Sequence, residues 1–103
     1  MSDTNKLNGG QVIIDYLIKE KVPYVFGLCG HGNIGLIDAM HERQDDIGTI
    51  SVHHESVAGF MADVYYRVSG QPIATFTSCG PGSANLPISL GNAFFDSVPF
   101  LAI

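Results

Sequence analysis

Hydrophobic positions recur along the chain with two different periods, and the changes of period divide it into short helices and strands. Near the start, Asn8 with Gln11 three positions later forms a capping box, and apolar residues then follow at helical spacing until Pro23. Four short runs, 24–28, 48–52, 73–77 and the run that begins at Val98, are rich in β-branched and aromatic residues and too short for helices. We therefore predict an N-terminal helix and four strands.

Helical spacing returns between the predicted strands. After a tight glycine turn over 29–32, Asn33 is the expected cap of a second helix, which carries Leu36, Ile37 and Met40. A longer helix begins near Glu55 and ends at the Gly70–Pro72 stretch, and a last helix follows a turn over 78–82. The long helix is expected to carry one wide apolar stripe, formed by Val57, Phe60, Met61, Val64, Tyr65 and Val68, and the last helix to point Leu86, Leu90, Ala93 and Phe94 inward.

This alternation of helices and strands with short connections predicts an α/β fold. The expected architecture is a mostly parallel sheet with helices on both faces. Ligands of such sheets bind at the carboxyl ends of the strands, where three loops are expected, 29–33, 53–55 and 78–82. The pattern contains no repeat or linker, and so indicates one structural unit.

Composition narrows the class of protein. Hydrophobic residues make up 46% of the 103 residues and charged residues 15%, which is typical of a well-packed globular domain. A net charge of -5 argues against a nucleic-acid partner, and no apolar run reaches the ~18 residues of a membrane span. The two cysteines form no framework of spacings and the N-terminal segment is polar, so we expect free thiols and a cytoplasmic location. Because the final apolar run, 98–103, reads as a buried strand, we expect the chain to be part of a longer one.

One glycine motif has two interpretations. Gly30, Gly32 and Gly35 match G-x-G-x-x-G after a predicted strand and before a helix, which a Rossmann-type unit uses to bind a dinucleotide pyrophosphate. A whole helix precedes this first strand, however, and Glu55 begins a helix instead of simply ending the second strand. A structural glycine turn is therefore favoured over a nucleotide site.

Two further residue patterns are expected to be structural. A zinc site of the H-E-x-x-H type would need a histidine where Ala58 stands, and the adjacent His53 and His54 point to opposite faces of a strand. Cys79 lacks the flanking glycines of a nucleophile elbow, and we expect it to be a small, mostly buried thiol.

Glu55 is the strongest candidate for chemistry. A carboxylate at a helix N-terminus is stabilised by the helix dipole, by ~0.3–1 kcal/mol, and this would account for an exposed glutamate. Glu55 also lies at the carboxyl end of a strand and is followed by Val57 and Phe60. A carboxyl group in such apolar surroundings is suited to proton transfer.

Three blocks of the sequence together resemble the pyrimidine-binding (Pyr) domain of thiamine diphosphate enzymes, in an acetolactate-synthase-like form. The first block is Val22-Pro23-Tyr24-Val25-Phe26-Gly27, followed by a glycine turn and Leu36-Ile37-Asp38-Ala39. The second block is His54-Glu55 with Ala58-Gly59-Phe60-Met61-Ala62-Asp63, Tyr65, Arg67 and Gly70-Gln71-Pro72. The third block runs from Thr77 to Leu86 and continues through Ala93-Phe94-Phe95-Asp96-Ser97-Val98-Pro99. The blocks follow the order and spacing of that family from about Gly9 to Ile103.

The resemblance implies a role for several residues. In that family the glutamate that matches Glu55 hydrogen-bonds N1′ of the cofactor pyrimidine and favours the imino tautomer, whose N4′ removes the thiazolium C2 proton. Pro81 and Gly82 match positions that pack on or near the pyrimidine ring, and Asn85 lies in the same block of the family pattern. We expect all three to bind the cofactor. His31 falls where some family decarboxylases place an acidic residue that faces the substrate, and we expect it to face the substrate here.

The resemblance also implies what lies outside this chain. The family binds the diphosphate through Mg²⁺ in a second, PP domain with a Gly-Asp-Gly motif, and this sequence has no Asp-Gly pair. We therefore expect residues 1–103 to be a partial Pyr domain that lacks the central and PP domains and is inactive alone. It is expected to work with a PP domain of the same or a partner chain, in a homo-oligomer. The expected enzyme, a transferase or lyase, makes or breaks a C–C bond next to a carbonyl, as in a 2-keto acid. The resemblance identifies neither the substrate nor whether FAD also binds. The alternatives are a noncatalytic Pyr-like docking module and a Rossmann-type nucleotide-binding unit.

Overall fold

A four-stranded, all-parallel sheet forms the centre of the molecule. The computed structural model describes residues 6–103. The strands stand in the order β2-β1-β3-β4, so the first strand lies inside the sheet and the second at its edge. Val25 of β1 pairs with Thr49 on one side and with Ala74 on the other. The strand bounds are β1 Tyr24–Gly27, β2 Gly48–Ser51, β3 Ala74–Phe76 and β4 Leu101–Ala102.

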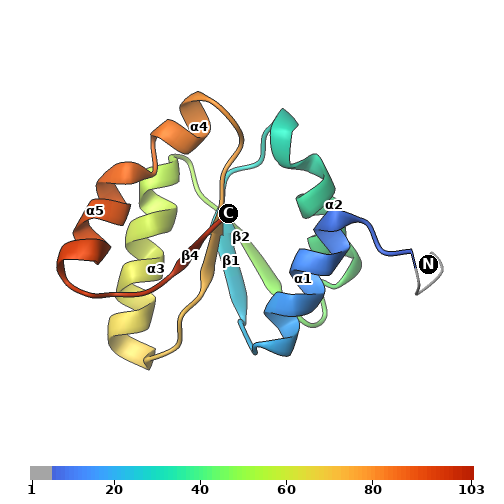
Figure 1. The fold of residues 1–103 in the computed structure, drawn as a ribbon, viewed down its shortest axis with the longest axis horizontal. Helices are drawn as coiled ribbons and strands as arrows, with labels where there is room; N and C mark the ends of the chain where they lie inside the picture. Colours follow the sequence, from blue (N-terminus) through green and yellow to red (C-terminus); the bar gives the residue numbers. More distant parts are fainter. Residues whose placement is uncertain (1–5) are drawn as a thin grey trace.

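Helices cover both faces of this sheet, as the sequence predicts. Figure 1 shows α1 and α2 on one side of the strands and α3, α4 and α5 on the other. Within residues 6–103, no helix is long and apolar enough to cross a bilayer. The helix bounds are α1 Gly9–Lys19, η1 (a 3-10 turn) His31–Asn33, α2 Ile34–Glu42, α3 Glu55–Ser69, α4 Pro81–Ala84 and α5 Pro87–Phe95.

The core lies between the two inner strands and the helices that pack on them. Val25 and Phe76 of the inner strands are almost fully buried, whereas the residues of β4 and most of β2 are exposed, because these two strands form the edges. Ile14 and Leu17 of α1 and Ala58 and Ala62 of α3 close the core from the two sides. Their spacing within each helix, three or four residues, brings each pair onto one face.

The predicted helix ends are partly confirmed. Asn8 and Gln11 form the capping box of α1, and Gly70 ends α3 in the left-handed conformation that glycine favours. Asn33 does not cap α2 through its side chain. Instead, its Oδ1 accepts from the Gly30 amide at 2.9 Å and its Nδ2 donates to the Leu28 carbonyl at 3.2 Å, so that it braces the glycine turn.

Helices α3 and α5 pack closely against each other. A Cβ atom built on Gly59 would lie 1.8 Å from Ser89 Oγ, so only glycine permits this approach. One turn further along α3, the buried Asp63 accepts hydrogen bonds from Asn92 Nδ2 at 2.9 Å and from Arg67 Nε. Arg67 also reaches Asp96 at 2.5 Å, which completes a polar link between the two helices.

Several expectations at the C-terminal end of the sequence are wrong, among them that of a buried final strand, since both residues of β4 are exposed at the edge of the sheet. Phe94 is 79% exposed and Leu90 37%, whereas Leu86 and Ala93 are buried as predicted. The sequence pattern predicts one continuous helix, but the chain forms the short α4 first and α5 begins only at Pro87, so that different residues face inward. The fourth strand begins at Leu101 and not at Val98, because Ser97, at φ 58°, places a turn before it.

Candidate functional site

Three loops meet at the carboxyl ends of the strands, where the order of an open α/β sheet places a ligand site. The amide of Gly32, in the loop after β1, donates to Ser78 Oγ in the loop after β3 at 3.1 Å. A Cβ built on Gly30 would lie 2.5 Å from the Ser78 Cβ, so these two loops are in direct contact. Glu55 follows β2 and lies beside α4, the helix that begins after the loop of Ser78.

Glu55 is the first residue of α3 and is only 7% exposed. It is preceded by His54, whose Nδ1 accepts from the Ser56 amide at 3.2 Å and so caps the helix. The cap fixes the point at which α3 begins, and thereby the direction in which Glu55 leaves the backbone. The predicted burial of this carboxyl group is confirmed.

The two oxygens of the Glu55 carboxylate have different surroundings. Oε1 accepts a hydrogen bond from Asn85 Nδ2 at 3.1 Å. Oε2 lies against Gly82, where an added Cβ would stand 3.2 Å from it. The absence of a side chain at Gly82 therefore leaves room beside this oxygen.

The short helix α4 presents Gly82 and Asn85 to Glu55. It begins with Pro81 directly after Gly80, whose φ of 68° with ψ of -127° is a conformation that residues with a side chain avoid. Ser83 Oγ donates back to the Gly80 carbonyl at 2.9 Å and closes the turn. Gly82 and Asn85 are three residues apart and lie on the same side of this turn.

The predicted site residues do not all share the same surroundings. Glu55, Gly82 and Asn85 are in contact, and Pro81 begins the same helix. His31 is exposed and lies in η1, next to the Gly32 that bonds to Ser78, and thus at the same end of the sheet. Sequence reasoning missed the contact of Asn85 with Glu55, because spacing along a chain does not reveal a hydrogen bond across 30 residues.

The remaining candidates of the sequence lie in different surroundings. Among residues 6–103, no three His, Cys, Asp or Glu side chains gather in a way that could hold a metal ion. Cys79 is exposed, so the expectation of a mostly buried thiol is wrong, because the loop after β3 lies at the surface. Gly30 and Gly32 serve the close contact with the Ser78 loop, as a structural glycine turn would.

Comparison with known proteins identifies the family. Residues 7–103 match the thiamine pyrophosphate enzyme N-terminal TPP binding domain, and the chain therefore belongs to this family. The membership favours a structural glycine turn over the Rossmann-type alternative for the glycine motif. It also confirms the resemblance that the three sequence blocks indicate.

The similar proteins are much longer than this chain. It is 38% identical over 103 residues to a probable 2-ketoarginine decarboxylase of Pseudomonas aeruginosa, covering 100% of this chain and 18% of that protein. It is 37% identical over 98 residues to the acetolactate synthase large subunit of Haemophilus influenzae (95% and 17%), and 34% identical over 95 residues to the mitochondrial acetolactate synthase catalytic subunit of Saccharomyces cerevisiae (92% and 14%). The chain thus spans less than a fifth of the length of these relatives.

Proposed function

We propose that this chain supplies the carboxyl group that activates thiamine diphosphate in an enzyme that makes or breaks a C–C bond next to a carbonyl. The observation that carries the proposal is the Glu55 carboxyl group, buried at the carboxyl end of the sheet with Oε1 occupied by Asn85 and Oε2 open beside Gly82. A similar decarboxylase and similar acetolactate synthases support the reaction class. The substrate class is a 2-keto acid or a related carbonyl compound.

The residues present fit the pyrimidine part of this cofactor. A flat ring needs space beside the carboxyl oxygen, and Gly82 leaves this space because it has no side chain. Glu55 would hold a ring nitrogen by sharing a proton with it, while Pro81 and Gly82 would line the ring. When bound, the cofactor supplies an electron sink for the bond next to the carbonyl. The Mg²⁺ ligands that hold its diphosphate are proposed to lie in a PP domain outside these 103 residues.

The protein's own contribution is to keep this carboxyl group dry and oriented. Burial leaves Glu55 only 7% exposed, and a general acid or base held in this way contributes ~10²–10⁴ in rate. His31, exposed at the same end of the sheet, is proposed to face the substrate.

An apolar groove supports the proposal that another domain covers α3. Phe26 forms its floor, and Val57, Phe60, Val64 and Val68 of α3 are between 38% and 83% exposed along it. The groove has a volume of about 620 Å³. We propose that the PP domain of the same or a partner chain packs on this face, within a homo-oligomer. The complete enzyme would be the full-length protein that contains this chain together with that domain.

The first prediction tests the role of Glu55. In the complete enzyme, Glu55→Gln keeps the shape of the side chain but removes the ionisable carboxyl group, so we expect hydrogen–deuterium exchange at the cofactor C2 to fall by ~10²–10⁴. NMR of the quenched cofactor measures this exchange, and Glu20→Gln, an exposed glutamate after α1, is the control. A helix-dipole role alone predicts normal exchange and a stability loss below ~1 kcal/mol. Normal exchange in folded Glu55→Gln would refute the proposed function.

A further inference from the structure

The contact between Asn85 and Glu55 assigns the asparagine a role that differs from ring binding. Asn85 Nδ2 stands 3.1 Å from Glu55 Oε1, and an ionised carboxylate can only accept, so the amide nitrogen must be the donor in this pair. The oxygen that Asn85 occupies is the one facing away from Gly82. One carboxylate oxygen is therefore held by the protein, and the other accepts no hydrogen bond from residues 6–103.

The backbone of the asparagine is held at the end of α4. Its backbone N–H donates to the carbonyls of Pro81 at 3.1 Å and Gly82 at 3.3 Å, at the end of α4. The start of α4 is constrained in turn by the proline ring and by the turn at Gly80. A donor on so short and so restrained an element can set the plane of the carboxylate that it binds.

We propose that Asn85 is a positioning residue. It binds Glu55 Oε1 and thereby directs Oε2, which lies beside Gly82, toward the ring nitrogen that shares a proton with Glu55. The inference rests on the proposed function of Glu55. It adds that the reactive oxygen is Oε2, and that Asn85 acts through Glu55 and not on the ring. Hydrogen bonds to charged groups are the stronger ones in proteins, so the loss of this bond has a measurable effect.

The chain offers a matched control within the same helical layer. Asn92 Nδ2 donates to the buried Asp63 at 2.9 Å, again from an asparagine to a carboxylate of α3, but away from the strand ends. Removal of Asn92 should therefore lower stability without affecting the site.

Substitutions of Asn85 in the complete enzyme separate orientation from packing. We expect Asn85→Ala to slow cofactor C2-proton exchange by about 10- to 100-fold. We expect Asn85→Asp, which keeps the shape but sets a second carboxylate beside Oε1, to slow it further. A purely structural role predicts the reverse order, because the isosteric aspartate preserves packing. Exchange in Asn92→Ala should stay within about twofold of the wild type.

A second measurement needs neither cofactor nor activity. With selective ¹⁵N labelling of asparagine, the side-chain amide resonance of Asn85 in the cofactor-free complete enzyme should shift on Glu55→Ala, whereas that of Asn92 should not. An unchanged Asn85 resonance, or wild-type exchange in Asn85→Ala, would overturn the inference. If Glu55→Gln loses exchange while Asn85→Ala keeps it, the proposed function stands and only the positioning role fails.

Discussion

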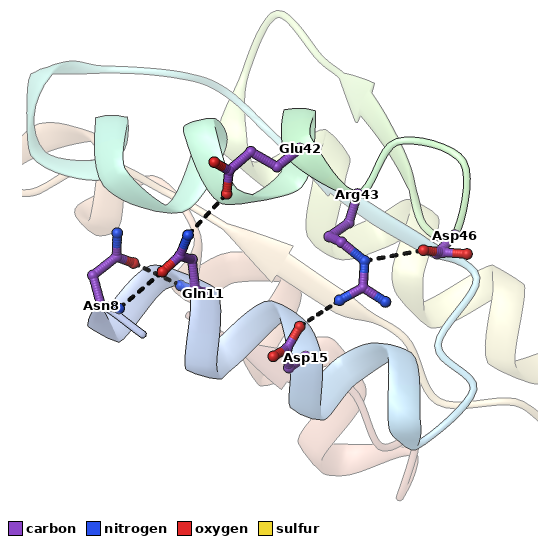
Figure 2. Close-up of polar contacts among 6 residues, drawn as sticks. All are labelled: Asn8, Gln11, Asp15, Glu42, Arg43 and Asp46. Atoms are coloured by element: carbon purple, nitrogen blue, oxygen red, sulfur yellow. Dashed lines mark hydrogen bonds and ion pairs between the residues drawn. The ribbon is translucent and has the colours of Figure 1, made fainter. Parts of the chain in front are cut away.

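The two helical layers differ in how their outer surfaces are built. On the α1/α2 side, polar side chains join the helices at the surface: Gln11 donates to Glu42 at 3.0 Å, and Arg43 reaches Asp15 at 2.5 Å and Asp46 at 3.0 Å (Figure 2). On the α3/α5 side, the polar link centres on a carboxylate that is only 2% exposed. The outer face of α3 is left apolar there.

This difference supports the proposal that another domain covers the α3 face and not the α1/α2 face. Helix α1 also exposes Val12, Ile13 and Tyr16, but Asp15 and Lys19 stand on the same helix. Along the groove on α3, the lining side chains carry no charge. Since the candidate site lies at the N-terminal end of that same helix, a domain that covers α3 would also lie close to Glu55.

The largest expected effect comes from a charge placed on the apolar face. Val64 is 57% exposed and Val12 53%, so Val64→Glu and Val12→Glu put the same charge on equally open helix surfaces of the two layers. Both should change the stability of the domain itself little. In the complete enzyme, Val64→Glu should weaken domain or subunit association by about 100-fold or more, because burial of an unpaired charge at an interface costs ~2–5 kcal/mol. Sedimentation velocity over a range of concentrations measures it. Equal behaviour of the two variants would remove the distinction between the layers.

A smaller effect is expected from the buried polar link. Arg67→Met leaves the Asp63 carboxylate inside the protein with Asn92 as its remaining side-chain donor. We expect the free energy of unfolding at pH 7 to fall by ~1.5–3 kcal/mol, the value typical of hydrogen bonds to charged groups. Urea unfolding measures the change. A loss below 0.5 kcal/mol would show that Asp63 tolerates burial without its guanidinium partner.

The same link makes the free energy of unfolding depend on pH. The hydrogen bond from Arg67 lowers the pKa of Asp63 below its ordinary value of 3.8, against burial, which raises it. The unfolded chain therefore binds a proton at a higher pH than the folded protein. The stabilisation is present above the unfolded pKa and is lost as the pH falls through the lower folded pKa. Asp63→Asn, which cannot titrate, should show a flatter loss of stability below about pH 4.

The sequence predicted well those features that depend on neighbouring residues in the chain. The α1 capping box, the start of α3 at Glu55 and its end at Gly70 each depend on groups within four residues. The parallel sheet followed from the alternation of short elements. The burial of Glu55 was also expected, because its position after a strand and before apolar residues is visible in the sequence.

Residues whose role depends on distant neighbours were predicted poorly. Phe94 was assigned by helical spacing and Cys79 by residue type, but the break between α4 and α5 and the surface position of the loop after β3 leave both exposed. The exposure of the α3 stripe could not be foreseen either, since helical spacing shows that a face is apolar and not what covers it. The contact of Asn85 with Glu55 depends on the close approach of α3 to α4, which no local pattern specifies.

The smallest expected effect is on the stability of the α1/α2 layer. Arg43 binds Asp15 and Asp46, but all three side chains are 40–50% exposed, and ion pairs in such positions contribute at most ~1 kcal/mol. We therefore expect Arg43→Met to lower the free energy of unfolding by less than ~1 kcal/mol. Because salt screens exposed charges, the difference from the wild type should shrink further between 0.01 and 1 M NaCl, over which the Debye length falls from about 30 to 3 Å. Urea unfolding at the two salt concentrations, with Arg67→Met run in parallel, checks this. A cost for Arg43→Met that equals that of Arg67→Met and persists in high salt would mean that the α1/α2 surface is as tightly organised as the interior link.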